Sequence, residues 1–281
     1  MVPKLDLAQF TETVSIPTLP EVVTKLNSMV DDEKVGLEDI GAVVSQDAPI
    51  SLKVLRIANS AVYGLGEPAT TVEDAAKVVG ARTIRNIAMQ ASIFNQYESL
   101  ESTEGFNLRG IWKHAIFTGQ LAQELAKRSP VVESDMAEEL YTCGLLHDIG
   151  KVVLLESLGE DYLEVYRLSR DSGRAVHLVE EEELGVTHTD VGALVAKRWD
   201  LHEKIIRVIQ HHHGPRYEIE ANPEVAIVAI ADQIAYRIET SSFEVFAKKL
   251  AALASNLLKL PPSEFEEVVE WGTEILPLIE I

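Results

Sequence analysis

The chain has 281 residues, 46% of them hydrophobic and 25% charged, which is the composition of a globular protein with one large domain or two lobes and excludes a disordered or fibrous chain. A formal net charge of -20 opposes binding to nucleic acid through neutralised phosphates, and it also disfavours anionic membranes. The first residues lack the apolar core of a signal peptide and no apolar run approaches the ~20 residues of a membrane span, so we expect a cytoplasmic protein.

The first part of the chain carries apolar side chains at the three-to-four-residue spacing of helices, and alternating strand patterns are scarce. Asp47 and Pro49 supply the chemistry of a helix start before an apolar segment. Gly80 is expected to end a later helix, with another helix following it. A polar stretch over residues 97–110 then separates two lobes, and the first lobe is predicted to span residues 1–104.

The second lobe is predicted to span residues 105–281. Its expected helices lie near residues 111–128, 136–148, 161–172, 188–199, 203–213 and 223–239. A C-terminal extension continues as helix with a break at Pro261 and Pro262. The acidic run 180–183 is interpreted as a solvated helical face. The predicted fold class is therefore all-α, with an N-terminal helical lobe packed on a second helical lobe.

Several polar residues interrupt the apolar faces of these helices, and such side chains point inward and need partners. His114 shares a helical face with Leu121, and a stripe ending at His147 and Asp148 runs along the helix near 136–148. Asp232 lies in an otherwise apolar helix. A buried, unpaired carboxylate is costly, so Asp232 requires a cation, a proton or hydrogen-bond donors.

Imidazoles and carboxylates on separate rigid helices suit a divalent transition metal such as Fe, Mn, Zn or Ni. The first predicted ligand set is His114, His147, Asp148 and Asp232. A second ion, bridged by Asp148, is conceivable on a further set of inward imidazoles, namely His188, His212 and His213. One or two ions are therefore expected, and hydrogen-bonded structural histidines without a metal are the alternative.

A metal centre with positions left for water or phosphate oxygens suggests hydrolysis of phosphate esters as a reaction. Asp148 and Lys151 are the candidate catalytic residues. Lys151 either holds a substrate phosphate or ends its helix favourably. Cys143 is the only cysteine, which excludes an internal disulfide and a Cys-rich zinc site.

The motifs of both lobes resemble the HDOD family of the HD superfamily of metal-dependent phosphohydrolases, over roughly residues 15–240. In the second lobe the resemblance is carried by the segment 144–151 (Gly-Leu-Leu-His-Asp-Ile-Gly-Lys), by His114 before it and by Asp232 after it. Further similar motifs are Ile16 to Pro20, Gln46 to Gly64, Trp112 to His114, Gly185 to His188, Gly192 with Ala193, Trp199, and His212 to Pro215.

The resemblance implies an all-helical fold and a role in bacterial signal transduction, with a separate protein as sensor and with a signalling protein as partner. The related HD-GYP phosphodiesterases carry a Gly-Tyr-Pro signature, where this chain has Gly214-Pro215-Arg216-Tyr217. Two hypotheses therefore stand. The favoured one is a signalling module with a metal-capable pocket, and the alternative is a metal-dependent phosphohydrolase acting on a nucleotide or another phosphate ester.

Overall fold

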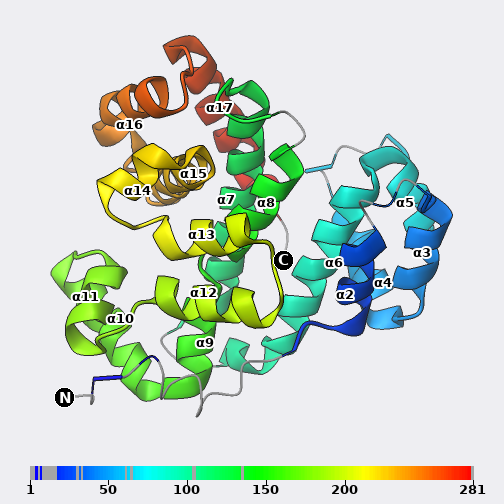
Figure 1. Cartoon of the computed structure of the whole chain (residues 1–281), viewed down its shortest axis with the longest axis horizontal. Coiled ribbons are helices and arrows are strands. Elements are labelled where there is room, and N and C mark those ends of the chain that lie inside the picture. Colours follow the sequence, from blue (N-terminus) through cyan, green and yellow to red (C-terminus); the bar gives the residue numbers. More distant parts are fainter. Residues whose placement is uncertain are drawn as a thin grey trace. The chain divides into compact units, whose positions relative to one another are not determined.

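The computed structural model describes residues 4, 5, 7, 18–29, 32, 34–60, 62, 63, 66–102, 106–133 and 136–279. Within these residues every regular element is a helix, so the predicted all-α fold is confirmed (Figure 1). None of the described helices is both long and apolar enough to cross a bilayer. The chain divides into two compact units, one mainly of Leu19–Ser99 and the other mainly of Leu100–Gly272.

Five helices make up the described part of the unit of residues 19–99. They are α2 (Glu21–Met29), α3 (Leu37–Ser45), α4 (Ala48–Ala58), α5 (Val72–Val79) and α6 (Ala81–Gln96). The predicted start of α4 is confirmed, because Asp47 Oδ1 accepts a hydrogen bond from the backbone N–H of Ile50 at 3.0 Å. Gly80 joins α5 to α6 with a φ of 88°, a conformation open to glycine, and so turns the chain between two helices without a loop.

The unit of residues 100–272 follows the short 3₁₀ turn Glu98–Ser102 and carries the longer series of helices. They are α7 (Leu108–Arg128), α8 (Ala137–Leu146), α9 (Ile149–Leu158), α10 (Glu160–Ser172), α11 (Val176–Glu183), α12 (His188–Arg198), α13 (Glu203–His211), α14 (Arg216–Ala221), α15 (Pro223–Glu239), α16 (Phe243–Leu257) and α17 (Pro262–Ile275), before the 3₁₀ turn Leu276–Leu278. The predicted break at Pro261 and Pro262 lies between α16 and α17.

The structure differs from the predicted elements around residue 147. The helix expected over 136–148 ends at Leu146, and His147 and Asp148 form the turn into α9. The helix α9 was not predicted because most of its side chains are apolar and buried, which removes the periodic contrast between two faces. The helix α14 was missed as well, since it is short.

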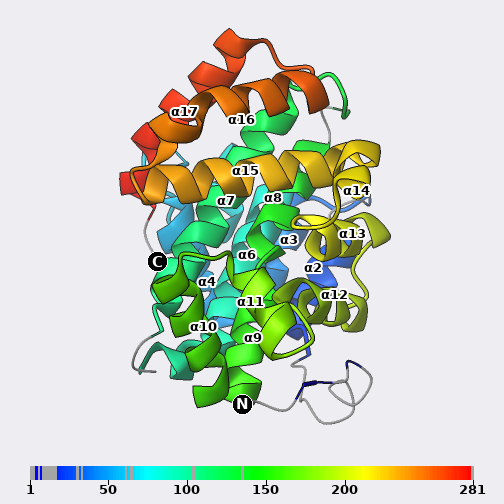
Figure 2. The same cartoon turned by 90° about the vertical axis from the view of Figure 1, so that its left-hand side faces the viewer.

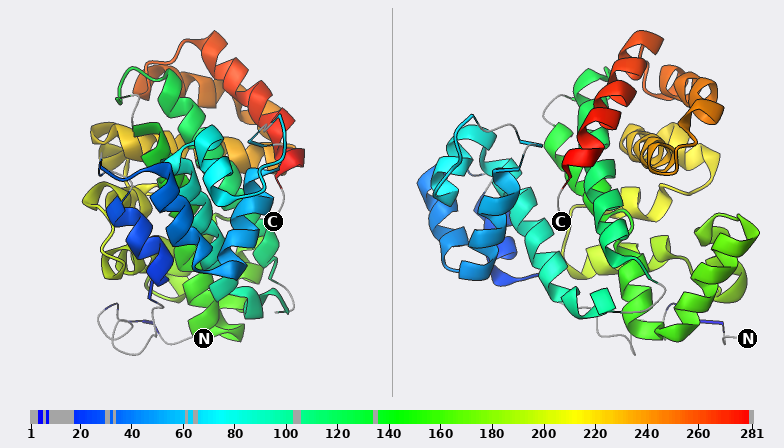
Figure 3. Two further views of the ribbon diagram at one scale, coloured as in Figure 1. Left: turned by 90° about the vertical axis from the view of Figure 1, so that its right-hand side faces the viewer. Right: turned by 180° about the vertical axis from the view of Figure 1, so that it is seen from behind.

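The helix α15 lies across α7 and α8, while α12 packs on both α9 and α13 (Figure 2). Near the end of this unit, α17 runs beside α7, where Gly272 faces Leu121 and Phe117 (Figure 3). An ion pair of 2.6 Å between Arg128 Nη1 and Glu267 Oε2 joins the same two helices. The helices α12, α13 and α15 pack on α8 or α9, the two helices that the His147-Asp148 turn connects.

Two close helix contacts depend on glycine. A Cβ at Gly144 would lie 2.6 Å from the Cα of Gly119, so α8 can approach α7 only because this atom is missing. A Cβ at Gly150 would overlap the carbonyl oxygen of His188 and would lie 2.8 Å from the backbone nitrogen of Gly192. Both glycines flank the His147-Asp148 turn, and the close packing they allow sets its distance from the neighbouring helices.

Candidate metal centre

His147 and Asp148 lie between α8 and α9, where neither side chain reaches solvent. His147 is 0% exposed and Asp148 is 3% exposed. The Nδ1 atom of His147 lies 2.6 Å from the carbonyl oxygen of Gly144, one turn earlier in the chain. Because only a protonated nitrogen can donate to a carbonyl, this contact assigns the proton to Nδ1 and leaves a lone pair on Nε2.

His188 is the first residue of α12 and is also fully buried. Its Nδ1 lies 2.7 Å from Glu180 Oε2, and its backbone N–H donates to the same oxygen at 2.8 Å. The other oxygen of Glu180 accepts a hydrogen bond of 2.7 Å from the hydroxyl of Tyr162. Glu180 therefore orients the His188 ring in the same way that the Gly144 carbonyl orients His147, with the Nε2 lone pair facing inward.

His212 and His213 follow the last turn of α13. The Nδ1 of His212 lies 2.9 Å from the carbonyl oxygen of Ile209, so its Nε2 also carries the lone pair. Burial lowers the pKa of His212 to about 4, although Asp148 acts in the opposite direction. Burial and the neighbouring His212 hold the pKa of His213 well below its usual range. Both imidazoles are therefore neutral at neutral pH and able to bind a metal.

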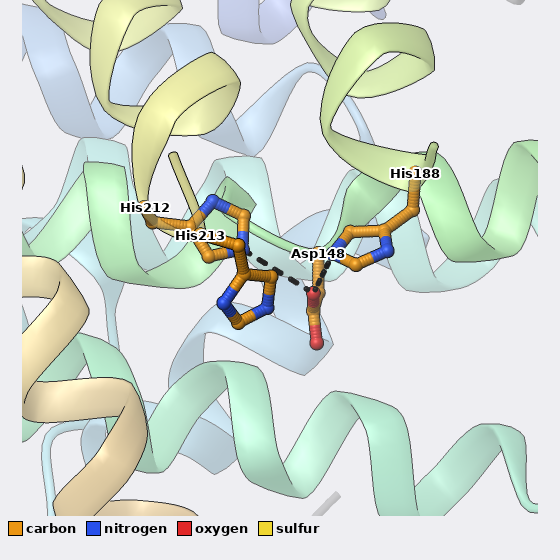
Figure 4. Close-up of side chains that lie close together, drawn as sticks. All are labelled: Asp148, His188, His212 and His213. Carbon is orange, nitrogen blue, oxygen red and sulfur yellow. Dashed lines mark ion pairs between the residues drawn. The ribbon is translucent and has the colours of Figure 1, made fainter. Parts of the chain in front are cut away.

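The Nε2 atoms of His188 and His212 converge on the carboxylate of Asp148 (Figure 4). The Nε2 atom of His147 lies close to the same carboxylate. His188 Nε2 lies 3.2 Å and His212 Nε2 lies 3.8 Å from Asp148 Oδ1, while His147 Nε2 lies 3.3 Å from Oδ2. Although burial opposes ionisation, the neighbouring His147 and the Lys151 amine hold the pKa of Asp148 well below its usual range. An ionised carboxylate thus stands at the centre of the histidines.

His114 on α7 and Asp232 on α15 complete one side of this group. His114 Nε2 lies 3.0 Å from Asp232 Oδ1, and His114 Nδ1 lies 2.8 Å from Glu239 Oε2. Burial alone would lower the pKa of His114, but its hydrogen bonds to these two carboxylates raise it to about 10. Asp232 Oδ1 is also 3.9 Å from His147 Nε2, and Oδ2 is 4.0 Å from His213 Nδ1.

The unpaired atoms at the centre test whether a metal fits. The Nε2 atoms of His147, His188 and His212 and the Oδ1 of Asp148 are buried and have no hydrogen-bond partner among the described residues. Lone pairs that face an ionised oxygen repel it, and buried polar groups without partners are costly. A cation at this point would satisfy all four atoms at once, so the residues fit a divalent ion of the transition series.

Within the described part of the chain, two overlapping groups have ligand atoms close enough to hold an ion. One is Asp148, His188, His212 and His213, and the other is His114, His147 and Asp148, with the ligand atoms in each group within 4.8 Å of one another. Asp232 adjoins the second group through His114. The structure therefore brings all seven predicted ligands together, and Asp148 is shared by both groups.

Lys151 lies in the first turn of α9 and does not end a helix, which corrects that part of the prediction. Its Nζ lies 2.5 Å from Asp148 Oδ2. Burial opposes the charged form, but Asp148 raises the pKa of Lys151 above its usual value, so the amine stays protonated. Lys151 is consequently a partly buried cation at the edge of the histidine group.

The sequence interpretation missed Glu180, Glu239 and His177. Glu180 was assigned to a solvated acidic face, and this is wrong because the residue is 0% exposed. The available signal for Glu180 was its spacing of four residues from the apolar Val176. For Glu239 the signal was its spacing of seven residues, or two helical turns, from Asp232, which places both residues on one face of the helix. His177 stacks on His213 with ring centroids 4.4 Å apart, although no apolar stripe in the sequence marks it.

The profile of the HDOD domain matches residues 16–215. An HDOD domain protein of unknown function from Geobacter sulfurreducens superposes with a TM-score of 0.79 at 22% identity, over 98% of this chain and 97% of its own. A provisionally named phosphohydrolase from Shewanella amazonensis SB2B superposes with a TM-score of 0.77 at 25% identity, over 98% of both chains.

Curated relatives match over shorter parts. An uncharacterized protein from Treponema pallidum (strain Nichols) is 28% identical over 218 residues, which are 77% of this chain and 41% of the relative. Ribonuclease Y of Thermotoga maritima is 28% identical over 169 residues, which are 59% of this chain and 26% of the relative. The chain spans less than half the length of either protein. The family profile nevertheless covers most of the chain, and the chain therefore belongs to the HDOD domain family.

Proposed function

We propose that this chain is a bacterial signal-transduction module whose buried histidine and aspartate centre holds divalent transition metal ions. One observation carries the metal part of the proposal. Three buried imidazoles have their Nδ1 atoms fixed by acceptors, and their bare Nε2 atoms all face Asp148. The signalling role rests on the resemblance of both lobes to the HDOD family.

The ligands divide between two positions in this proposal. His114, His147 and Asp232 hold one ion with Asp148, while His188, His212 and His213 hold the other. Because the pKa of His114 is raised to about 10, its Nε2 must release a proton when the ion binds. The shared carboxylate supplies negative charge to both. Imidazole nitrogens mixed with carboxylate oxygens favour Fe, Mn, Zn or Ni over Mg or Ca, which prefer all-oxygen ligands.

Elemental analysis tests the metal centre directly. After expression with supplements of Fe, Mn, Zn and Ni, we expect purified protein to carry one or two ions per chain, because the ligand atoms are already oriented. Dialysis against a chelator should remove these ions and lower the thermal unfolding temperature. Protein that carries no ion after supplementation, and that gains none in a titration with Zn²⁺ or Mn²⁺, contradicts the proposal.

Glu180 provides a further test, since it orients a ligand without belonging to the ligand set. In Glu180→Gln an NH₂ group replaces one of two oxygens that accept hydrogen bonds from His188 and Tyr162. We expect metal affinity to fall by about 10- to 100-fold, the usual effect of losing such a partner. Isothermal titration with Zn²⁺ measures this fall.

The matched control is Glu181→Gln, which makes the same chemical change at the next residue of α11, where the side chain is exposed. It should bind Zn²⁺ like the wild type. Equal affinities for the Glu180 and Glu181 variants contradict the orienting role.

A second candidate function is hydrolysis of a phosphate ester. It is favoured by the Asp148 carboxylate that both ligand groups share and by the match to ribonuclease Y, whose name describes cleavage of RNA. When bound, two divalent ions would neutralise phosphate charge and activate water. Lys151 adds a protonated amine beside Asp148 and could hold a phosphate oxygen. A net charge of -20 favours a small phosphate ester over a long RNA strand.

A substrate screen separates the two functions. Metal-loaded protein is incubated with bis(4-nitrophenyl) phosphate, cyclic dinucleotides and nucleoside phosphates, beside the Asp148→Ala variant. Turnover that requires both the metal and Asp148 supports the enzyme. Binding of these compounds without turnover supports the signalling module. Turnover that is unchanged in Asp148→Ala contradicts the assignment of Asp148 as a catalytic residue.

A further inference from the structure

A cavity of about 380 Å³ lies next to the metal centre, within the unit of residues 100–272. The helices α14, α15 and α16 supply its walls, and His212 lines it at one side. Apart from His212 and Gly214, its lining residues follow residue 215, where the match to the family profile ends. The cavity is therefore built mainly by this chain's own C-terminal helices. Its volume falls within the roughly 300–1,000 Å³ of small-molecule sites.

The cavity has apolar walls and a few polar groups. The aliphatic residues are Ile219, Ala229, Ile230, Leu250, Leu253 and Leu257. Gln233, Asn256 and the ion pair of Arg216 with Glu220 supply the polar groups. This mixture suits a ligand with broad apolar faces and a few polar atoms at its edges.

Two residues connect the cavity to the metal centre. His212 lines the cavity while its Nε2 faces Asp148. Gln233 also lines the cavity, and its Nε2 donates a hydrogen bond of 3.3 Å to Asp232 Oδ2. A ligand held through its phosphate at the centre would thus place its adjacent group against the cavity. The carbonyl oxygen of Gln233 is an acceptor for the edge of that group.

The geometry points to a specificity pocket for phosphate esters that bear a flat, largely apolar ring. This inference rests on the proposed metal centre and names the class of ligand that the centre receives. Inorganic phosphate or a sugar phosphate would leave the aliphatic walls unfilled. A simple alkyl chain would fill them but would offer no aromatic face to the Arg216 guanidinium and no polarised edge to Gln233. An aryl group and a nucleobase both have the required shape, with apolar faces and a polar or polarised edge.

Phosphonates that resist hydrolysis provide the test with the metal-loaded chain of 281 residues. We expect 1-naphthylmethylphosphonate to bind at least about tenfold more tightly than methylphosphonate in isothermal titration, because only the former fills the pocket. n-Hexylphosphonate should bind more weakly than the naphthyl compound. The phosphonate analogues of AMP and of ribose 5-phosphate form a second pair. The gain in affinity that the base gives in this pair, compared with the gain from the naphthyl ring, distinguishes a nucleobase from a plain aryl ring.

Variants locate the effect in the cavity. Ala229→Leu fills the pocket from α15, and Leu253→Ser makes its α16 wall polar at a partly exposed position that tolerates change. Each should remove most of the advantage in affinity that 1-naphthylmethylphosphonate has over methylphosphonate. The affinity for methylphosphonate and the metal content should stay unchanged. Ala252→Leu is the matched control, because Ala252 is exposed on α16 and does not line the cavity. It should behave like the wild type.

The possible results separate this inference from the proposed function. Metal-loaded protein that binds methylphosphonate and 1-naphthylmethylphosphonate equally overturns the pocket alone. Equal affinities for the hexyl and naphthyl compounds overturn its preference for a ring. If the naphthyl compound keeps its higher affinity in both cavity variants, its ring binds elsewhere, and the assignment of the cavity as the ring site is overturned. Protein that binds neither metal nor methylphosphonate overturns the proposed function, and the pocket inference with it.

Discussion

Replacement of Asp148 by Asn is expected to abolish binding at both metal positions. The change keeps the size of the side chain but removes the charge that three Nε2 atoms face, at 3.2 Å from His188, 3.3 Å from His147 and 3.8 Å from His212. Loss of a residue that merely orients a ligand costs about 10- to 100-fold in affinity, so loss of the shared carboxylate should exceed 100-fold. Elemental analysis and Zn²⁺ titration measure the effect.

The same substitution should also remove stabilisation by metal. An ion present at 100 times its dissociation constant stabilises a folded protein by about 2.7 kcal/mol, and this term disappears when the site is lost. Thermal unfolding with and without Zn²⁺ should therefore show a shift for the wild type and none for Asp148→Asn. Asp161→Asn, an exposed change on α10, should keep the full shift. A metal-induced shift that persists in Asp148→Asn contradicts the shared role of Asp148.

Replacement of Gly150 by Ala is expected to destabilise the unit of residues 100–272. Helix propensity alone predicts the opposite sign, since Ala is favoured over Gly inside a helix by about 1 kcal/mol. The new Cβ, however, would overlap the carbonyl oxygen of His188 and approach the backbone nitrogen of Gly192 to 2.8 Å. Neither backbone atom can move away without separating α9 from α12. Overpacking of this kind costs about 1–3 kcal/mol or more, so packing outweighs propensity.

Urea unfolding measures this loss as a lower midpoint, and Zn²⁺ titration should show weaker binding because His188 is displaced. Gly66→Ala is the control, since a Cβ there meets no atom within 4 Å and the same substitution should leave the midpoint nearly unchanged. A Gly150→Ala protein with wild-type stability and Zn²⁺ affinity contradicts the close contact of α9 with α12.

Periodicity was sufficient to predict most of the helices and the inward direction of the ligands. His114, His188 and Asp232 lie on helices whose apolar faces repeat every three to four residues, so the buried side of each could be recognised locally. It failed for α9, where apolar residues on most sides leave no contrast, and for Glu180, whose acidic neighbours concealed a buried position. The uniformly apolar composition of α9 caused the first error, and the charges next to Glu180 caused the second.

The sequence by itself determined the helical fold, the family and the types of ligand atom, because these depend on local spacing and on residue chemistry. The tautomers of His147 and His212 were visible only in the structure, although each depends on a local contact with a carbonyl oxygen three residues earlier. Only the tertiary structure decided that Asp148 is shared by both ligand groups, that Glu180 orients His188, and that a cavity adjoins the centre. These features join residues on different helices, and their distances depend on how closely those helices pack, notably at Gly150.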